Sequence, residues 1–277
     1  MRVRFPLSAL YMWPTIINIG SFRLQSLTLL AILALFFTAF VFWRKGKEEH
    51  YDLTELFDAF LLSGFFGVII GRLAFVLFHW GVFKEDWLQI FNIVQSPGNE
   101  PLLALSAAAI YLYFLAKKYK WDAFEVLDFW ATSISLGMVF VYLGFFLAGS
   151  YAGQLTNVPW GVVIPGTFEK SHPVQLYFML FYLFLFNYLL KVEYKYRTFD
   201  WYRRGKKTAQ SGFLLAMFLI LTGFFYLLMS MLSLPGMVIR DRVIDPFVYI
   251  LVLLIGLILL FYRSGRSLRT KRKRPIR

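Results

Sequence analysis

The chain has 277 residues, of which 59% are hydrophobic and 16% charged, with no cysteine and a formal net charge of +13. A soluble domain of this length does not need so much apolar surface, so the composition predicts a multi-pass membrane protein. Without cysteine, disulfides, thiol catalysis and thiolate metal sites are excluded. The three histidines, His50, His79 and His172, lie in different segments, and we therefore expect no metal site and no cofactor.

Seven apolar segments approach the roughly 20 residues that a helix needs to cross a bilayer. They are residues 22–43, 56–78, 102–116, 124–147, 173–190, 212–232 and 246–262. We find no internal repeat and no sign of a separate soluble domain. The sequence therefore predicts an all-α fold, with a single transmembrane domain over residues 1–262 and a basic cytoplasmic tail at 263–277.

Lysine and arginine are distributed unequally between the loops of these segments. They are concentrated after the first, third, fifth and seventh segments. The first of these clusters contains Arg44, Lys45 and Lys47, and the second contains Lys117, Lys118 and Lys120. The third lies between positions 191 and 207, and the fourth is the tail. The opposite loops contain only Lys84, Lys170, Arg240 and Arg242. Because positive loops stay on the cytoplasmic side, this pattern predicts an outside N-terminus and an inside C-terminus. Basic clusters beside apolar segments are better explained by topology and anionic lipid than by nucleic acid, and we expect no nucleic-acid partner.

Arg72 is an arginine within the second apolar segment. A charge at membrane depth is costly and by default marks a functional site. The alternative is that the side chain lies near the outer end of the segment and extends to the interface. Asp58 and Asp128 lie near the predicted inner ends of their segments, where an interfacial helix cap or a charge partner is a more common role than a catalytic acid.

A second group of polar and glycine residues surrounds the start of the fifth segment. His172 and Pro173 open this segment, and Gln175 and Tyr177 follow near the predicted outer interface. Gln175 can donate to a lipid phosphate or to a neighbouring helix, and Tyr177 is typical of the aromatic belt at a membrane interface. The glycines before this segment either ease helix packing or break the backbone beside a lipid head group; they are Gly144, Gly149 and Gly153.

Three motifs resemble the prolipoprotein diacylglyceryl transferase family. They are Gly71-Arg72-Leu73 with Val76-Leu77-Phe78, then Pro159-Trp160-Gly161-Val162-Val163, and His172-Pro173-Val174-Gln175-Leu176-Tyr177. The resemblance covers most of the chain and implies a multi-pass protein of the bacterial plasma (inner) membrane. It implies transfer of diacylglyceryl from phosphatidylglycerol to the lipobox cysteine of a prolipoprotein. Phosphatidylglycerol and prolipoprotein signal peptides are then the expected partners. The phospholipid-binding residues would be Arg72, His172, Gln175, Gly144, Gly149 and Gly153.

The chain departs from the family where charged and polar motif residues are expected. The resemblance places arginines at Tyr142 and Tyr226, and a histidine-containing motif in the region of Glu100 to Ala104. Further family residues are replaced by Phe145, Ala148, Ser150, Gln154 and Phe178. Tyrosine carries no positive charge at neutral pH, so stabilisation of a phosphate leaving group is reduced.

No catalytic residue can be assigned. One alternative is a non-catalytic protein that binds phospholipid or lipoprotein signal peptides. Another is a site rebuilt from Arg72, His172 and Gln175, with Glu100 or Arg240.

Overall fold

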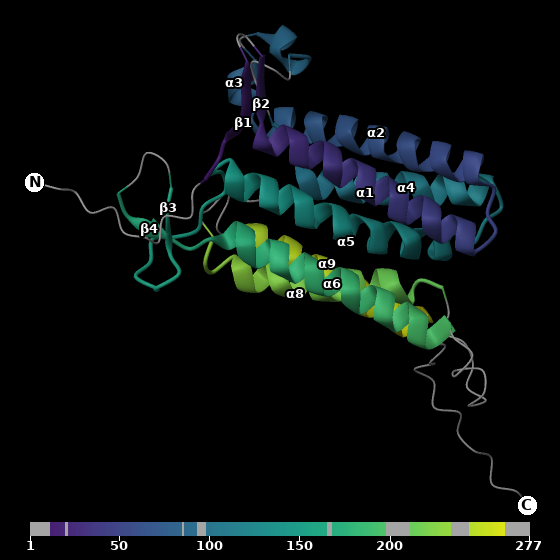
Figure 1. Ribbon diagram of the computed structural model, residues 1–277. Coiled ribbons are helices and arrows are strands. Elements are labelled where there is room, and N and C mark those ends of the chain that lie inside the picture. The colour runs from purple at the N-terminus through teal and green to yellow at the C-terminus, as the bar shows by residue number, and fades with distance from the viewer. Residues whose placement is uncertain are drawn as a thin grey trace, which may run out of the picture.

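The computed structural model describes residues 12–19, 22–84, 86–92, 98–164, 168–197, 211–233 and 244–263. Within these residues, long helices run side by side in one bundle (Figure 1). They are α1 (Ser26–Glu48), α2 (Leu53–Phe78), α4 (Pro101–Lys118), α5 (Ala123–Leu147), α6 (Val174–Arg197), α8 (Phe213–Met229) and α9 (Ile244–Arg263). The short helices α3 (Trp80–Phe83) and η1 (Trp87–Ile90) follow α2.

The all-α, multi-pass character predicted from the composition is confirmed. In the described part of the chain, six helices are long and apolar enough to cross a membrane, and α8 is apolar but has 17 residues. Each long helix lies on one of the apolar segments identified in the sequence. The total of seven spans, their orientation and the division into residues 1–262 and 263–277 stay predictions, and the tail beyond residue 263 lies outside the described residues.

The ends of several helices are fixed by local sequence. Asp52 and Asp122 are the N-caps of α2 and α5, and each carboxylate accepts hydrogen bonds from two backbone N–H groups of the first turn. Pro101 occupies the first turn of α4, where a missing N–H leaves no intrahelical bond unmade. These signals divide a nearly continuous apolar sequence into separate helices.

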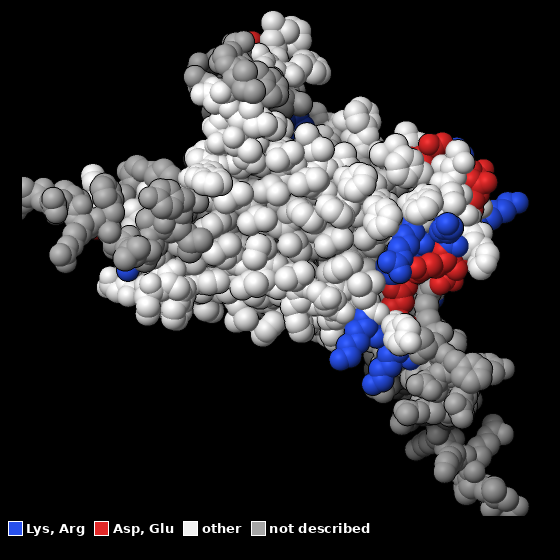
Figure 2. Space-filling view, viewed as in Figure 1, with Lys and Arg blue, Asp and Glu red and all other residues white. Residues whose placement is uncertain are grey.

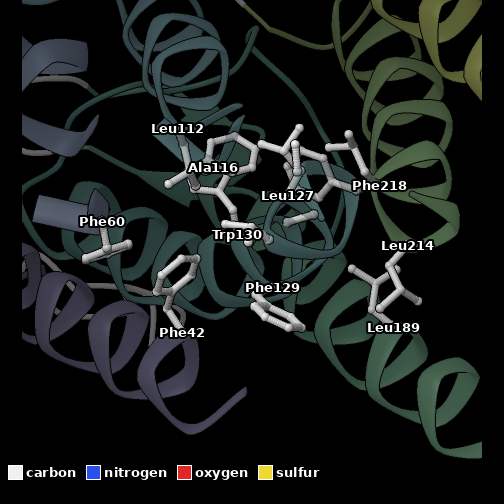
Figure 3. Close-up of a cluster of buried hydrophobic side chains, with 14 of the residues drawn as sticks. Phe42, Phe60, Leu112, Ala116, Leu127, Phe129, Trp130, Leu189, Leu214 and Phe218 are labelled. Atoms are coloured by element: carbon white, nitrogen blue, oxygen red, sulfur yellow. The ribbon is translucent and has the colours of Figure 1, made fainter. Parts of the chain in front are cut away.

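Helix α5 is the central element of the core, and it packs against α1, α4, α6 and α8. Figure 3 shows Phe42 of α1 between Phe60 of α2 and Phe129 of α5, and its ring lies 4.9 Å from the Phe60 ring and 6.4 Å from the Phe129 ring. Phe129 is fully buried, and the Trp130 and Phe218 rings meet edge to face at 6.0 Å. Helix α5 thus buries large apolar side chains on several of its faces, together with the polar side chains of Asp128, Thr132, Ser133 and Ser135.

The outer surface of the bundle is apolar along its length. Exposed aromatic side chains such as Phe36, Phe65 and Phe184 lie on α1, α2 and α6. Figure 2 shows most of the visible charged side chains at one end of the bundle, with a largely uncharged surface between the two ends. This distribution is the one that a hydrocarbon layer requires.

Two short hairpins were not predicted from the sequence. Strands β1 (Thr15–Ile19) and β2 (Phe22–Gln25) pair antiparallel, as do β3 (Val162–Val163) and β4 (Lys170–Ser171). The predicted first span began at residue 22, which is wrong by four residues because α1 begins at Ser26. Residues 22–25 alternate apolar and polar side chains, which favours a strand over a helix. The backbone N–H of Ser26 donates to the Pro14 carbonyl at 3.0 Å and ties the hairpin to α1.

Orientation can be tested directly because the chain has no native cysteine. We expect a cysteine introduced at Ser8 to react with an impermeant maleimide in intact cells, and one at Ser267 to react only after lysis. The reason is the excess of lysine and arginine on the side of the predicted tail. Labelling of the Ser267 position from outside would contradict the predicted orientation.

Candidate functional site

A cavity of about 520 Å³ lies between α4, α5, α8 and α9. Its lining is predominantly apolar and includes Trp130 of α5 and Phe218 of α8. Ile110 and Phe114 of α4 and Ile255 of α9 also line it, and all three are exposed at the surface of the bundle. The cavity therefore reaches the apolar outer surface, and its size is typical of a site for a small molecule or lipid.

Four tyrosines from four helices contribute to the polar part of the cavity lining; we call Tyr142, Tyr182, Tyr226 and Tyr249 the tyrosine cluster. The hydroxyl of Tyr226 on α8 lies 2.7 Å from that of Tyr142 on α5 and 3.1 Å from that of Tyr182 on α6. The Tyr249 ring of α9 lies 5.3 Å from the Tyr226 ring. Three hydroxyls from separate helices thus form one neutral hydrogen-bonded network inside the bundle.

The ring of Phe178 supports this network from the side. It stacks on Tyr142 with ring centroids 4.6 Å apart and meets Tyr226 edge to face at 4.7 Å. Phe178 and Tyr182 are both almost completely buried. An apolar ring at this position leaves the cluster without a charged partner on that side.

Thr222 lies one turn before Tyr226 on α8 and lines the same cavity. Its Oγ1 is buried and has no hydrogen-bond partner among the described residues. Buried hydroxyls are normally paired, so the unpaired Oγ1 of this lining residue is a candidate for a hydrogen bond to a ligand. Among the described lining residues, none is lysine, arginine or histidine.

Acidic groups lie at the end of the cavity where α4 begins. Glu100 is the N-cap of α4, directly before the lining residue Pro101, and only 7% of its surface is exposed. Burial, and to a lesser degree the charge of Asp245, raise the pKa of Glu100 to about 7. Burial and the charge of Glu100 also raise the pKa of Tyr151, a further lining residue. The carboxyl of Glu100 is therefore only partly ionised near neutral pH.

Four of the residues predicted to bind phospholipid meet in the loop after α5, outside the cavity lining. Gly149 has a φ of +69°, and the Gly153 N–H donates to the His172 carbonyl at 3.0 Å. A Cβ on Gly153 would lie 2.5 Å from the Val174 side chain, so only glycine fits there. Gln175 is buried, and its Nε2 donates to the Ser150 carbonyl at 2.5 Å. Its Oε1 has no partner among the described residues.

The other two predicted site residues lie elsewhere. A Cβ on Gly144 would be in contact with Leu27 and Leu30, so this glycine allows α5 to approach α1. Arg72 is buried, and its guanidinium donates to the carbonyls of Gln89, Ile90 and Gly98 at 3.0 to 3.1 Å. Arg72 thus fixes the segment between α2 and α4. Binding of a lipid phosphate by these six residues stays a prediction.

Replacing Arg72 with leucine is expected to lower the free energy of unfolding by about 3 kcal/mol, because three partly buried carbonyls lose a charged donor. Arg72→Lys keeps the charge without the planar fork and should recover only part of this loss. Thermal unfolding in detergent measures both variants, with bound phospholipid determined on the same samples. Unchanged thermal stability together with a loss of anionic phospholipid would instead favour the predicted phosphate contact.

The fold and the cavity define a multi-pass α-helical membrane protein with an internal site open to the apolar surface. Residues 14–262 match the family model described as prolipoprotein diacylglyceryl transferase, and the chain belongs to this family.

Several similar proteins are named phosphatidylglycerol–prolipoprotein diacylglyceryl transferase. The protein from Aeromonas hydrophila is 32% identical over 213 residues, covering 74% of this chain and 73% of its own length. That from Mannheimia succiniciproducens is 28% identical and covers 76% of each chain. That from Clostridium tetani is 28% identical and covers 65% of this chain and 69% of its own length.

The sequence identified Tyr142 and Tyr226 only as positions where arginine was expected. It contained no signal that their hydroxyls meet, because they are 84 residues apart in the chain. Thr222 and Tyr249 were missed, since a hydroxyl on an apolar helix resembles an ordinary packing residue. Asp128 was predicted to be a cap or a charge partner, and it is a cap: its carboxylate accepts from the N–H groups of Gly212 and Leu215 at 2.7 Å each.

Proposed function

We propose that this protein binds a diacyl membrane lipid in the cavity between α4, α5, α8 and α9 and does not carry out the transferase reaction. The observation that carries this proposal is the hydrogen bond of 2.7 Å between the hydroxyls of Tyr142 and Tyr226. At these positions the resemblance implies two arginines. A phosphate leaving group needs positive charge in a site of low dielectric constant, and a tyrosine hydroxyl supplies only a neutral donor.

Lipid binding is supported by the form of the cavity. Its apolar lining reaches the outer surface at Ile110, Phe114 and Ile255, where acyl chains of the surrounding membrane can enter. Its polar side chains are few, which suits a ligand that is mostly apolar. The names of the relatives make phosphatidylglycerol and prolipoproteins the first ligands to test. The bacterial origin of those relatives supports our proposal that the protein lies in the bacterial plasma (inner) membrane.

The proposal is tested with the purified full chain in detergent. Labelled phosphatidylglycerol and a prolipoprotein signal peptide are supplied together, with the Aeromonas hydrophila relative as the active control. We expect diacyl lipid to copurify with this protein, and no diacylglyceryl-modified peptide to form. Formation of diacylglyceryl-modified peptide would contradict the proposal that the protein does not carry out the transferase reaction. A preparation free of diacyl lipid would contradict the proposal that it binds such a lipid.

A pair of phenylalanine substitutions locates the bound lipid. Ala109 lines the cavity on α4, whereas Ala31 is exposed on the outer face of α1. Ala109→Phe should fill part of the cavity and remove most of the copurified lipid, while Ala31→Phe should leave it unchanged. Equal lipid content in the two variants would show that the lipid is held elsewhere.

A second candidate function retains catalysis, with Glu100 as the base that deprotonates a thiol. The observation in its favour is the pKa of about 7, which suits a general base at neutral pH. Activity would then rise with pH through about 7 as the carboxyl ionises, and Glu100→Gln would abolish it. The sequence-predicted contributors Arg72, His172 and Gln175 do not line the cavity, and Arg240 lies outside the described residues.

A further inference from the structure

We infer that the lipid held in this cavity is uncharged and carries a free hydroxyl, as in diacylglycerol, and is not an anionic phospholipid. The inference rests on the proposed lipid binding and deepens it by naming the ligand class. Three features carry it: the charge of the cavity, the hydrogen-bonding groups of its lining residues, and the position of its apolar part.

The charge of the cavity disfavours a phosphate. No described lining residue is a lysine, arginine or histidine, and the buried carboxyls of Glu100 and Asp245 lie at the α4 end. A phosphate brought beside the tyrosine cluster would lose its hydration without gaining a positive partner. It would also be repelled by any ionised carboxylate at this end. An uncharged head group does not lose the hydration of a charge and is not repelled by a carboxylate.

The hydroxyls of the lining residues match a ligand hydroxyl. The Tyr226 hydroxyl is already shared with Tyr142 and Tyr182, which leaves that network able to accept or donate one further hydrogen bond. Thr222 Oγ1 is unpaired, buried and one helical turn away. A ligand hydroxyl both donates and accepts, so it can satisfy the threonine and join the network without any net charge.

The apolar part of the cavity is placed for acyl chains. Trp130, Phe218 and Phe114 line it toward the α4 C-terminus, away from Glu100. The exposed side chains of Phe114 and Ile255 bring this part to the outer surface of the bundle. A lipid with its hydroxyl at Thr222 can therefore extend its chains toward the surrounding hydrocarbon.

The test uses the full chain in nanodiscs that contain equal amounts of diacylglycerol and phosphatidylglycerol, with retained lipid counted by native mass spectrometry. We expect diacylglycerol to be retained at least about tenfold over phosphatidylglycerol. Thr222→Val keeps the shape of the side chain and removes only the unpaired hydroxyl. It should lower diacylglycerol retention about fivefold, the usual weight of one hydrogen bond, with thermal stability unchanged. Thr38→Val, on α1 outside the cavity lining, is the matched control and should retain the lipid.

A second variant tests the charge argument independently. Glu100→Gln removes one carboxylate from the α4 end, and we expect it to raise phosphatidylglycerol retention while diacylglycerol stays bound. Preferential retention of phosphatidylglycerol by the unmodified protein would overturn the inference and leave the proposed lipid binding intact. Retention of neither lipid would overturn both. A loss of diacylglycerol in Thr38→Val equal to that in Thr222→Val would also overturn it.

Discussion

In a strain depleted of its own diacylglyceryl transferase, this protein is expected not to restore growth or the modification of prolipoproteins. Two positions where the resemblance implies arginine hold Tyr142 and Tyr226, whose hydroxyls bond to each other. Loss of one donor that stabilises developing negative charge typically lowers kcat by about 10²–10³-fold. The absence of two cations together should lower the rate by about 10⁴-fold or more, and growth with labelled prolipoprotein measures the outcome.

Returning the two arginines alone is expected to be insufficient. In Tyr142→Arg/Tyr226→Arg the cations would lie beside Phe178, which stacks on Tyr142 and cannot pair with them. The segment from Glu100 to Ala104 would still lack a histidine. The relative from Aeromonas hydrophila, expressed at the same level, is the positive control. Growth of the depleted strain with the unmodified protein, together with diacylglyceryl-modified prolipoprotein, would overturn the non-catalytic reading.

The long helices could be predicted from the sequence because their signal is local and strong. A bilayer requires runs of apolar residues, and caps such as Asp52 and Asp122 mark where these runs begin as helices. The β1–β2 hairpin was missed, although residues 22–25 alternate in a way that favours a strand. A hydropathy window averages over such a short alternation and assigns it to the adjoining helix.

The site was predicted less well because its groups depend on tertiary contacts. Arg72 was correctly noted as a costly charge, but its three carbonyl acceptors belong to a segment 17 to 26 residues away whose path the sequence does not indicate. The tyrosine cluster depends on the packing of four helices. The motif glycines mark close backbone contacts, as at Gly153, and such contacts occur both beside a ligand and within a packed loop.

Replacement of Asp128 with alanine is expected to cause the largest loss of stability among single substitutions in the core. Its buried carboxylate spans from α5 to the start of α8, accepting from the N–H groups of Gly212 and Leu215 at 2.7 Å each. Alanine removes two charge-assisted hydrogen bonds and leaves two N–H groups unpaired where water is scarce. The cost should be about 3–5 kcal/mol, seen as an unfolding transition at lower temperature in detergent.

Two further substitutions on α5 distinguish the loss of stability caused by removing this cap from the loss caused by changing any buried polar residue. Asp128→Asn keeps one carbonyl oxygen as acceptor and should lose about half as much stability as the alanine variant. Ser133→Ala removes a fully buried hydroxyl that only donates to the Trp130 carbonyl of the same helix, and should cost under about 1 kcal/mol. Because α8 carries Thr222 and Tyr226, loosening its first turn should also weaken lipid retention in Asp128→Ala. Equal losses in the alanine variants at positions 128 and 133 would show that the contact between α5 and α8 is not what holds α8 in place.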